Sequence, residues 1–199
     1  MGDLAKKLSW LLGVCGFMRP NDICCIDVAL SAVVSNKLQL AVVFPKEKRG
    51  RQRIIKYVHL SPHDDTAICP VKAYEVYRTR TTSMDIPVAH TKDPERKITP
   101  LLRHSKNLER PLRSSTISVY MNSISSLFLP KGATPPKLRA LGSTLAAMAG
   151  VPVPDIMVQG NWSSPKIFEN HYRLSSMVSN NLSHSTLGIP LQPHMDMAP

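Results

Sequence analysis

Apolar residues recur at a spacing of three to four along the first part of the chain, which predicts an amphipathic helix over residues 3–18. The positions concerned are Leu4, Leu8, Leu11, Leu12 and Cys15. This helix is expected to end near Gly16, because Pro20 cannot continue it. A short second helix, beginning at Asn21 or Asp22, is predicted to follow.

Two runs of β-branched and apolar residues come next. Residues 38–44 (LQLAVVF) and 53–60 (RIIKYVHL) have the composition of strands, and the polar segment that joins them contains Gly50. We therefore predict an antiparallel hairpin over residues 38–60, with its turn close to Gly50.

Helical spacing returns over residues 69–81, where Pro70 suits the first turn, and over residues 114–129, where Ser114 or Ser115 can cap the start. The segment between them, residues 82–112, is rich in proline and mixed in charge. We predict that it is mostly loop, with a short strand at residues 98–102.

The last patterned stretch, residues 135–174, predicts two helices, a tight turn and a third short helix. Arg139 lies on the first of these helices, Trp162 on the turn, and Tyr172 ten residues further on. Residues 176–199 are poor in charge and rich in Ser and Asn, which predicts a C-terminal tail. Together the patterns predict an α+β fold, mainly helical, with helices around a small antiparallel β-sheet.

The only feature of the composition that indicates a kind of binding partner is the net charge. The 199 residues suit one compact domain, and a hydrophobic content of 43% is ordinary for a globular protein. Lys and Arg number 25 against 14 Asp and Glu, a formal net charge of +11. Such an excess predicts attraction to polyanions, of which nucleic acid is the commonest. A basic protein with no nucleic-acid partner is the alternative.

Much of this charge gathers in the predicted hairpin, where six basic residues face a single acid, Glu47. They are Lys46, Lys48, Arg49, Arg51, Arg53 and Lys56. A hairpin with this charge repels itself and is stabilised by lying along a phosphate backbone. A solvated turn without chemistry is the alternative interpretation.

The four cysteines form no CxxC pair, and the adjacent Cys24 and Cys25 are poorly placed for a disulfide or a metal site. We therefore predict buried, reduced thiols in a reducing compartment. No apolar run approaches the roughly 20 residues of a membrane span, and the N-terminus lacks the pattern of a secretory signal. These features predict an intracellular protein that does not bind membranes.

Five residues then occur in a telling order: Arg19, Asp22 three residues later, Arg139, and the pair Trp162 and Tyr172 within GNWSSPKIFENHYRL. With the basic hairpin between them, this series resembles the catalytic domain of tyrosine recombinases, the phage-integrase family. The last phrase is most similar to eukaryotic, transposon-derived (Crypton-like) members. The resemblance implies that Tyr172 attacks a DNA phosphodiester while Arg19 and Arg139 hold the phosphate.

The resemblance also implies roles around this core. Lys46, or failing that Lys48, would protonate the leaving 5′ oxygen, and Trp162 would donate its N–H to the phosphate. Further DNA contacts are expected from Lys48, Arg49, Arg51, Arg53, Lys56, Lys137 and His171. Simpler interpretations stay open: a helix-capping Arg19, a Trp162 that closes the core, and a Tyr172 that only packs.

The chain departs from the family pattern in two ways. Pro136 occupies the place, three residues before Arg139, where the family usually carries a histidine. The resemblance also covers only about residues 4–175. It therefore implies a catalytic domain over residues 1–175 that lacks the separate N-terminal DNA-clamping domain, as in a truncated copy, followed by the tail at 176–199.

We expect from these features an enzyme that cuts and rejoins double-stranded DNA through a 3′-phosphotyrosine intermediate, in the nucleus and with self-association on DNA. Such a transfer requires no metal or cofactor, and the chain has no acidic cluster for a metal. One alternative is a catalytically inactive DNA-binding relic of a mobile element. Another is a basic RNA- or partner-binding protein, in which the predicted site residues would not converge in space.

Overall fold

The computed structural model describes residues 1–45, 48–49, 52–90, 93–104 and 106–174. Its helices are α1 (Gly2–Cys15), α2 (Pro20–Cys24), α3 (Pro70–Thr79), α4 (Ser114–Ser125), α5 (Leu138–Met148), α6 (Val153–Gly160) and α7 (Pro165–His171), with 3-10 turns η1 (Thr82–Met84) and η2 (Ser126–Phe128). Its strands are β1 (Ile26–Val34), β2 (Lys37–Val42), β3 (Lys48–Arg49), β4 (Gln52–Arg53), β5 (Lys56–Leu60), β6 (Val88–His90), β7 (Asp93–Ile98), β8 (Arg103–His104) and β9 (Asn107–Pro111).

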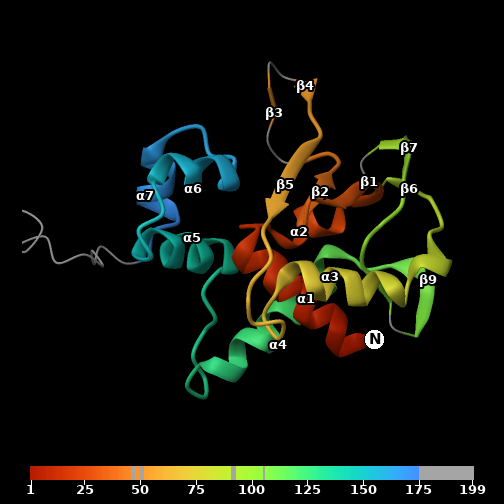
Figure 1. Cartoon of the computed structure of the whole chain (residues 1–199), viewed down its shortest axis with the longest axis horizontal. Helices are drawn as coiled ribbons and strands as arrows, with labels where there is room; N and C mark the ends of the chain where they lie inside the picture. The colour runs from red at the N-terminus through yellow and green to blue at the C-terminus, as the bar shows by residue number, and fades with distance from the viewer. Residues whose placement is uncertain (46–47, 50–51, 91–92, 105, 175–199) are drawn as a thin grey trace, which may run out of the picture.

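Helix α1 lies at the centre of the molecule and contacts α3, α4 and α5 (Figure 1). The apolar stripe seen in the sequence is its buried face, on which Leu8 and Leu12 are completely inaccessible to solvent. Because side chains three and four residues apart share one side of a helix, this stripe lets α1 support three helices at once. The predicted helices all form, each within a few residues of its expected bounds.

The main sheet is antiparallel with the strand order β1-β2-β5. Strand β2 lies in the middle, and Leu38, Leu40 and Val42 on it are fully buried. The strands of the predicted hairpin are β2 and β5, which pair from Leu38 with Leu60 to Val42 with Lys56. The segment that joins them carries the small β3–β4 hairpin, which projects from the body of the molecule (Figure 1).

Two expectations about residues 82–112 are wrong, and one strand was not predicted. The expected strand at residues 98–102 does not form, because β7 ends at Ile98 and β8 begins only at Arg103. Strand β1 was not predicted, since its run IDVALSAVV follows directly on a short helix. Residues 82–112 are not mostly loop, because they form η1 and the two hairpins β6–β7 and β8–β9. The single expected sheet is therefore one three-stranded sheet with three two-stranded ones. Strands β7 and β9 are polar and contain Pro94 and Pro111, which two-stranded hairpins accept because one edge of each strand is unpaired.

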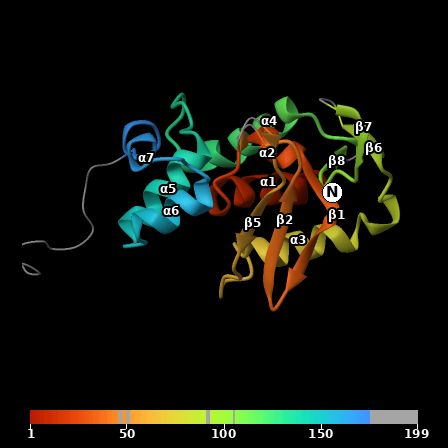
Figure 2. The same ribbon diagram turned by 90° about the horizontal axis from the view of Figure 1, so that it is seen from above.

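Helices α5, α6 and α7 gather at one end of the molecule, away from the hairpins β6–β7 and β8–β9 (Figures 1 and 2). They enclose a second apolar cluster, whose buried members are Phe17, Ile156, Trp162 and Phe168. Phe17 comes from the corner between α1 and α2, so this cluster joins the C-terminal helices to the start of the chain.

The four cysteines are free thiols, and Cys25 and Cys69 are buried as predicted. Cys24 is half-buried, whereas Cys15 is exposed at the end of α1, so the expectation of burial is wrong for Cys15. In the part of the chain that the structure describes, no helix has both the length and the apolar character needed to cross a membrane.

Candidate active site

Arg19 is held in place by the corner between α1 and α2. It is the N-cap residue of α2, with an extended backbone, and Pro20 occupies the first helical position. The carboxylate of Asp22 accepts a hydrogen bond from the Arg19 backbone N–H at 3.0 Å and lies 3.9 Å from its guanidinium. Asp22 is buried at 2% exposure. Asp22 therefore fixes both the backbone and the side chain of Arg19.

Arg139 is brought to the same place by a close approach of two helices. One turn further along α5, Gly142 lies against the end of α1, where an added Cβ would come within 2.0 Å of the Val14 carbonyl oxygen. Since only glycine permits this contact, the Arg139 face of α5 lies directly against the α1–α2 corner. The buried guanidinium donates to the Phe17 carbonyl at 2.7 Å and to the Gly160 carbonyl.

Trp162 follows the tight turn predicted after α6. Asn161 adopts the left-handed conformation, with φ of 52°, and the Trp162 backbone N–H donates back to Met157 at 3.0 Å. The residue is 9% exposed, and its ring packs on Phe168, with the Arg139 guanidinium 4.7 Å from the ring centroid. Its indole N–H has no hydrogen-bond partner among the described residues. Trp162 thus closes the apolar cluster, and its indole N–H is buried with it.

Tyr172 is the C-cap residue of α7, and its ring lies 4.6 Å from the Trp162 ring. Thr144 on α5 holds its backbone: the threonine hydroxyl donates to the Tyr172 carbonyl at 3.1 Å and accepts from the Leu174 N–H at 2.8 Å. The helix that carries Arg139 therefore also anchors the segment that carries Tyr172.

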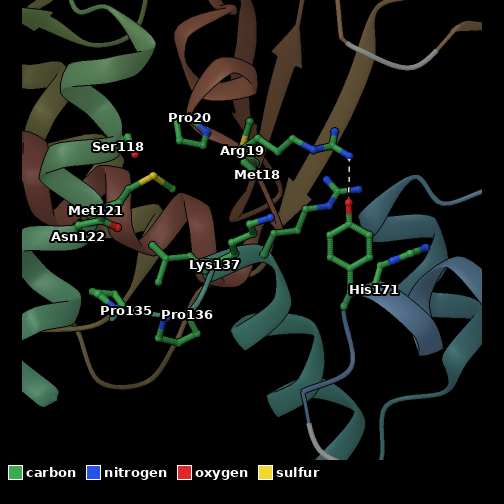
Figure 3. A pocket seen from close by; sticks show the side chains of 13 residues that line it. Met18, Arg19, Pro20, Ser118, Met121, Asn122, Pro135, Pro136, Lys137 and His171 are labelled. Carbon is green, nitrogen blue, oxygen red and sulfur yellow. Dashed lines mark hydrogen bonds between the residues drawn. The ribbon is translucent and has the colours of Figure 1, made fainter. Parts of the chain in front are cut away.

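The Tyr172 hydroxyl accepts a hydrogen bond from Nη2 of Arg19 at 3.3 Å (Figure 3). Partial burial alone would raise the pKa of this phenol. The hydrogen bond from Arg19, with the charges of Arg19 and Arg139, outweighs burial and holds the pKa of Tyr172 below its ordinary value. The Trp162 indole N–H adds to this lowering of the pKa, although its geometry is not that of an ordinary hydrogen bond.

A pocket of about 670 Å³ opens beside this hydroxyl and is lined by Arg19, Arg139 and Tyr172 together. Lys137, the N-cap residue of α5, also lines it, as does the exposed His171. Figure 3 shows the Lys137 side chain reaching into the middle of the pocket. A phenol with a lowered pKa next to several cations is an arrangement that can attack an anionic ester.

Pro136 lines the pocket as well, at the place where the resembling family usually carries a histidine. A proline has no side-chain group that can donate or accept a proton. Whatever acid–base help the reaction needs must come from other residues.

The remaining predicted site residues belong to the basic hairpin, and the structure describes only some of them. Lys46 and Arg51 lie outside the described residues, so their assigned roles stay predictions. Lys48 and Arg49 form β3, and Arg53 belongs to β4, on the projecting hairpin. Lys56 lies on β5 and the residue is only 7% exposed, which is less than a surface contact to DNA requires.

Thr144 and Gly142 help to build this site, and neither was singled out from the sequence. A lone threonine five residues after Arg139 gives no signal, since its importance depends on the return of the chain at residues 172–174. Within the described ranges, no group of three or more His, Cys, Asp or Glu side chains is arranged to hold a metal ion.

No protein-family model matches the sequence, and neither does any curated protein sequence. The structure, in contrast, resembles several solved structures. It superposes on the XerA recombinase with a TM-score of 0.60 and 16% identity, over 96% of this chain and 64% of that one. For the XerH site-specific recombinase, bound to palindromic difH substrate in a post-cleavage complex, the TM-score is 0.57 with 12% identity, over 93% and 45% of the two chains.

A third match is the integrase of the transposon Tn1549 in complex with transposon right-end DNA, with a TM-score of 0.56 and 13% identity over 92% and 58% of the two chains. The chain spans less than two thirds of each of these proteins. At such low identity the likeness establishes the fold, which is the α+β fold of tyrosine recombinase catalytic domains. The predicted affinity to Crypton-like members is not addressed by these matches.

Proposed function

We propose that this chain is the catalytic domain of a tyrosine recombinase or integrase, which cuts and rejoins double-stranded DNA through a 3′-phosphotyrosine intermediate. The observation that carries the proposal is the contact of Tyr172 with Arg19, beside Arg139 and Trp162. Arg139 lies on α5, whereas the other three lie at the start of α2, after α6 and at the end of α7. Two of the DNA-bound structures that the fold resembles are a recombinase and an integrase, which supports DNA as the partner.

In the proposed reaction, the Tyr172 oxygen attacks the phosphorus of a DNA phosphodiester. A bond forms between that oxygen and phosphorus, and the bond from phosphorus to the 5′ oxygen of the next nucleotide breaks. The phenol loses its proton to solvent, and the departing 5′ oxygen gains one, for which we propose Lys46 as the acid. Attack by a 5′ hydroxyl on the phosphotyrosine reverses these steps and rejoins the strand.

Positive donors near the phosphate stabilise the charge that grows on its oxygens in the transition state. Arg19 is suited to this task, since its partly exposed guanidinium faces the pocket and keeps its charge at every relevant pH. We propose the indole N–H of Trp162 as a further donor, which must become accessible when DNA binds, since it is buried and Trp162 does not line the pocket. The Arg139 guanidinium contacts the rings of Trp162 and Tyr172 and holds them in place.

A DNA-binding relic without catalysis is the second candidate, and the specific observation in its favour is Pro136 in the pocket wall. Nicked duplex DNA separates the two candidates, because a short strand released by cleavage diffuses away and traps the covalent intermediate. The enzyme is expected to yield a protein–DNA adduct that survives denaturation. A protein that binds the same DNA without any adduct would be the relic.

Arg19→Ala is expected to slow adduct formation by about 10²–10³-fold, the usual effect of removing one transition-state donor. It should also shift the pH–rate profile. Arg19 lowers the pKa of Tyr172, so its loss raises that pKa, and the phenolate then forms only at higher pH. The rising limb of the profile, measured in single turnovers between about pH 7 and pH 10, should therefore move to higher pH. Arg173→Ala is the control, since Arg173 pairs with Glu169 instead. An unmoved limb in Arg19→Ala would contradict this role.

DNA binding is expected to depend strongly on salt and weakly on sequence, because the basic hairpin is proposed to contact phosphates. Changing Arg49, Arg51 and Arg53 to glutamine should reduce the slope of log affinity against log salt by up to about 2.7, or about 0.9 per lost contact. The matched control removes three charges from α1 and α3, with Lys6, Lys7 and Lys72 changed to glutamine. Equal slopes for the two variants would show that the hairpin does not touch DNA.

A further inference from the structure

The pocket beside Tyr172 is larger than a phosphate group requires. Its volume of about 670 Å³ lies within the range of roughly 300–1,000 Å³ that small-molecule sites have. Arg19 and Arg139 occupy one end of it, and Lys137 reaches into the middle. The other end extends to α4 and to the connector at Pro135 and Pro136 (Figure 3). There is therefore space for a group attached to the phosphate.

The walls at this far end are mostly apolar. Met121 contributes a buried side chain from α4, and Pro135 and Pro136 add two apolar rings from the connector. Surfaces of this kind favour a flat, weakly polar ring system over a charged or strongly hydrated group.

One polar strip interrupts the apolar wall. It consists of Ser118 and Asn122, which lie one helical turn apart on the pocket face of α4, beside Met121 and opposite Lys137 (Figure 3). The side chains of Ser118 and Asn122 make no hydrogen bond within the described part of the chain. An asparagine amide offers both a donor and an acceptor, so it can bind the edge of a nucleobase.

Charge is distributed unequally between the two ends. Arg19 and Arg139 line the end near Tyr172, with the Lys137 side chain in the middle of the pocket, and none of the described residues that line the pocket is acidic. The site thus combines an anion-binding end with an apolar slot that carries hydrogen-bonding groups. A phosphate joined through a sugar to a nucleobase has this same division of properties.

We propose that the pocket holds one nucleotide of the bound DNA strand, with its phosphate beside Arg19 and its base unstacked between α4 and the Pro135–Pro136 connector. This proposal rests on the proposed function, because it takes DNA as the source of the nucleotide. The energy of unstacking is offset by contact of the base with Met121 and the two prolines. The pocket thereby fixes the strand relative to the Tyr172 oxygen.

The first experiment measures binding of dAMP and of 2-deoxyribose 5-phosphate by NMR titration, which separates the base from the phosphate. The wild-type protein is expected to bind dAMP at least about tenfold more tightly. Ser118→Phe, which fills the slot, should remove this preference, while Ser123→Phe on the exposed side of α4 should keep it. Asn122→Leu, at an exposed position that does not affect folding, should weaken dAMP alone. Equal affinities in the wild type, or a preference that survives both pocket variants, would overturn the proposal.

A second arm tests whether the nucleotide comes from DNA. A duplex with a central nick carries 2-aminopurine next to the nick, and the fluorescence of this base rises when it unstacks. The rise is expected with the wild type and with Ser123→Phe, but not with Ser118→Phe. A pocket that binds dAMP without any rise would take free nucleotides, which overturns DNA as the source. Neither arm requires cleavage, so a protein that forms no adduct can still pass both, and the two proposals fail independently.

Discussion

Replacing Tyr172 by phenylalanine is expected to abolish the covalent protein–DNA adduct while leaving DNA binding nearly unchanged. The substitution removes the attacking hydroxyl group and leaves the rest of the side chain unchanged. The phenylalanine ring keeps its contact with Trp162 and its place near the Arg139 guanidinium. The Tyr172 carbonyl and the Leu174 N–H keep their hydrogen bonds to the Thr144 hydroxyl. Only the hydrogen bond from Arg19 is lost, at a cost to stability of about 1 kcal/mol.

The measurement is a denaturing gel of protein incubated with labelled, nicked duplex DNA, alongside a binding titration of the same samples. Tyr120→Phe on α4 is the matched control, since it removes a phenol oxygen from another half-buried tyrosine. It is expected to form adduct as the wild type does. If Tyr172→Phe still forms adduct, the nucleophile is a different residue, and His171 and Tyr120 become the candidates to test.

The sequence was informative about this site because the relevant signals are local. The corner at Arg19 depends on its near neighbours Pro20 and Asp22. The turn at Trp162 depends on the adjacent Asn161. The helices were equally predictable, since an apolar stripe of helical spacing is typical of a helix that packs on a core. What the sequence does not contain is the distance between Arg19 and Tyr172, which results from how α1 and α5 pack.

The unpredicted features depend on partners remote in sequence. Thr144 acquires its role only because residues 172–174 return to α5. Strand β7 is polar throughout most of its length and forms because β6 pairs with it, so composition gives no sign of it. Gly142 likewise resembles an ordinary helix-weakening glycine until the carbonyl of Val14 is seen against it. Such close approaches are properties of the packed molecule and not of any local pattern.

Arg139→Ala is expected to lower the free energy of unfolding by about 3–6 kcal/mol, a large share of the roughly 5–15 kcal/mol that stabilises a domain. The Arg139 side chain is buried, with the residue 3% exposed, and its guanidinium donates to the carbonyls of Phe17 and Gly160. Those carbonyls belong to the α1–α2 corner and to the end of α6, so Arg139 joins three parts of the fold. Alanine leaves both oxygens buried without this charged donor, and it also removes the contact with the Trp162 ring.

Chemical denaturation, compared with Arg19→Ala and Arg139→Lys, tests this prediction. Arg19 has a side chain that is 29% exposed, and its loss should change stability by less than about 1 kcal/mol. Lysine keeps the charge at position 139 but lacks a planar fork that reaches two carbonyls, so Arg139→Lys should also be destabilised. A stability of Arg139→Ala close to that of Arg19→Ala would show that the guanidinium is not structural. If the prediction holds, lost cleavage in Arg139 variants reflects unfolding as well as chemistry, and Arg19 is the arginine whose variants report on the phosphate.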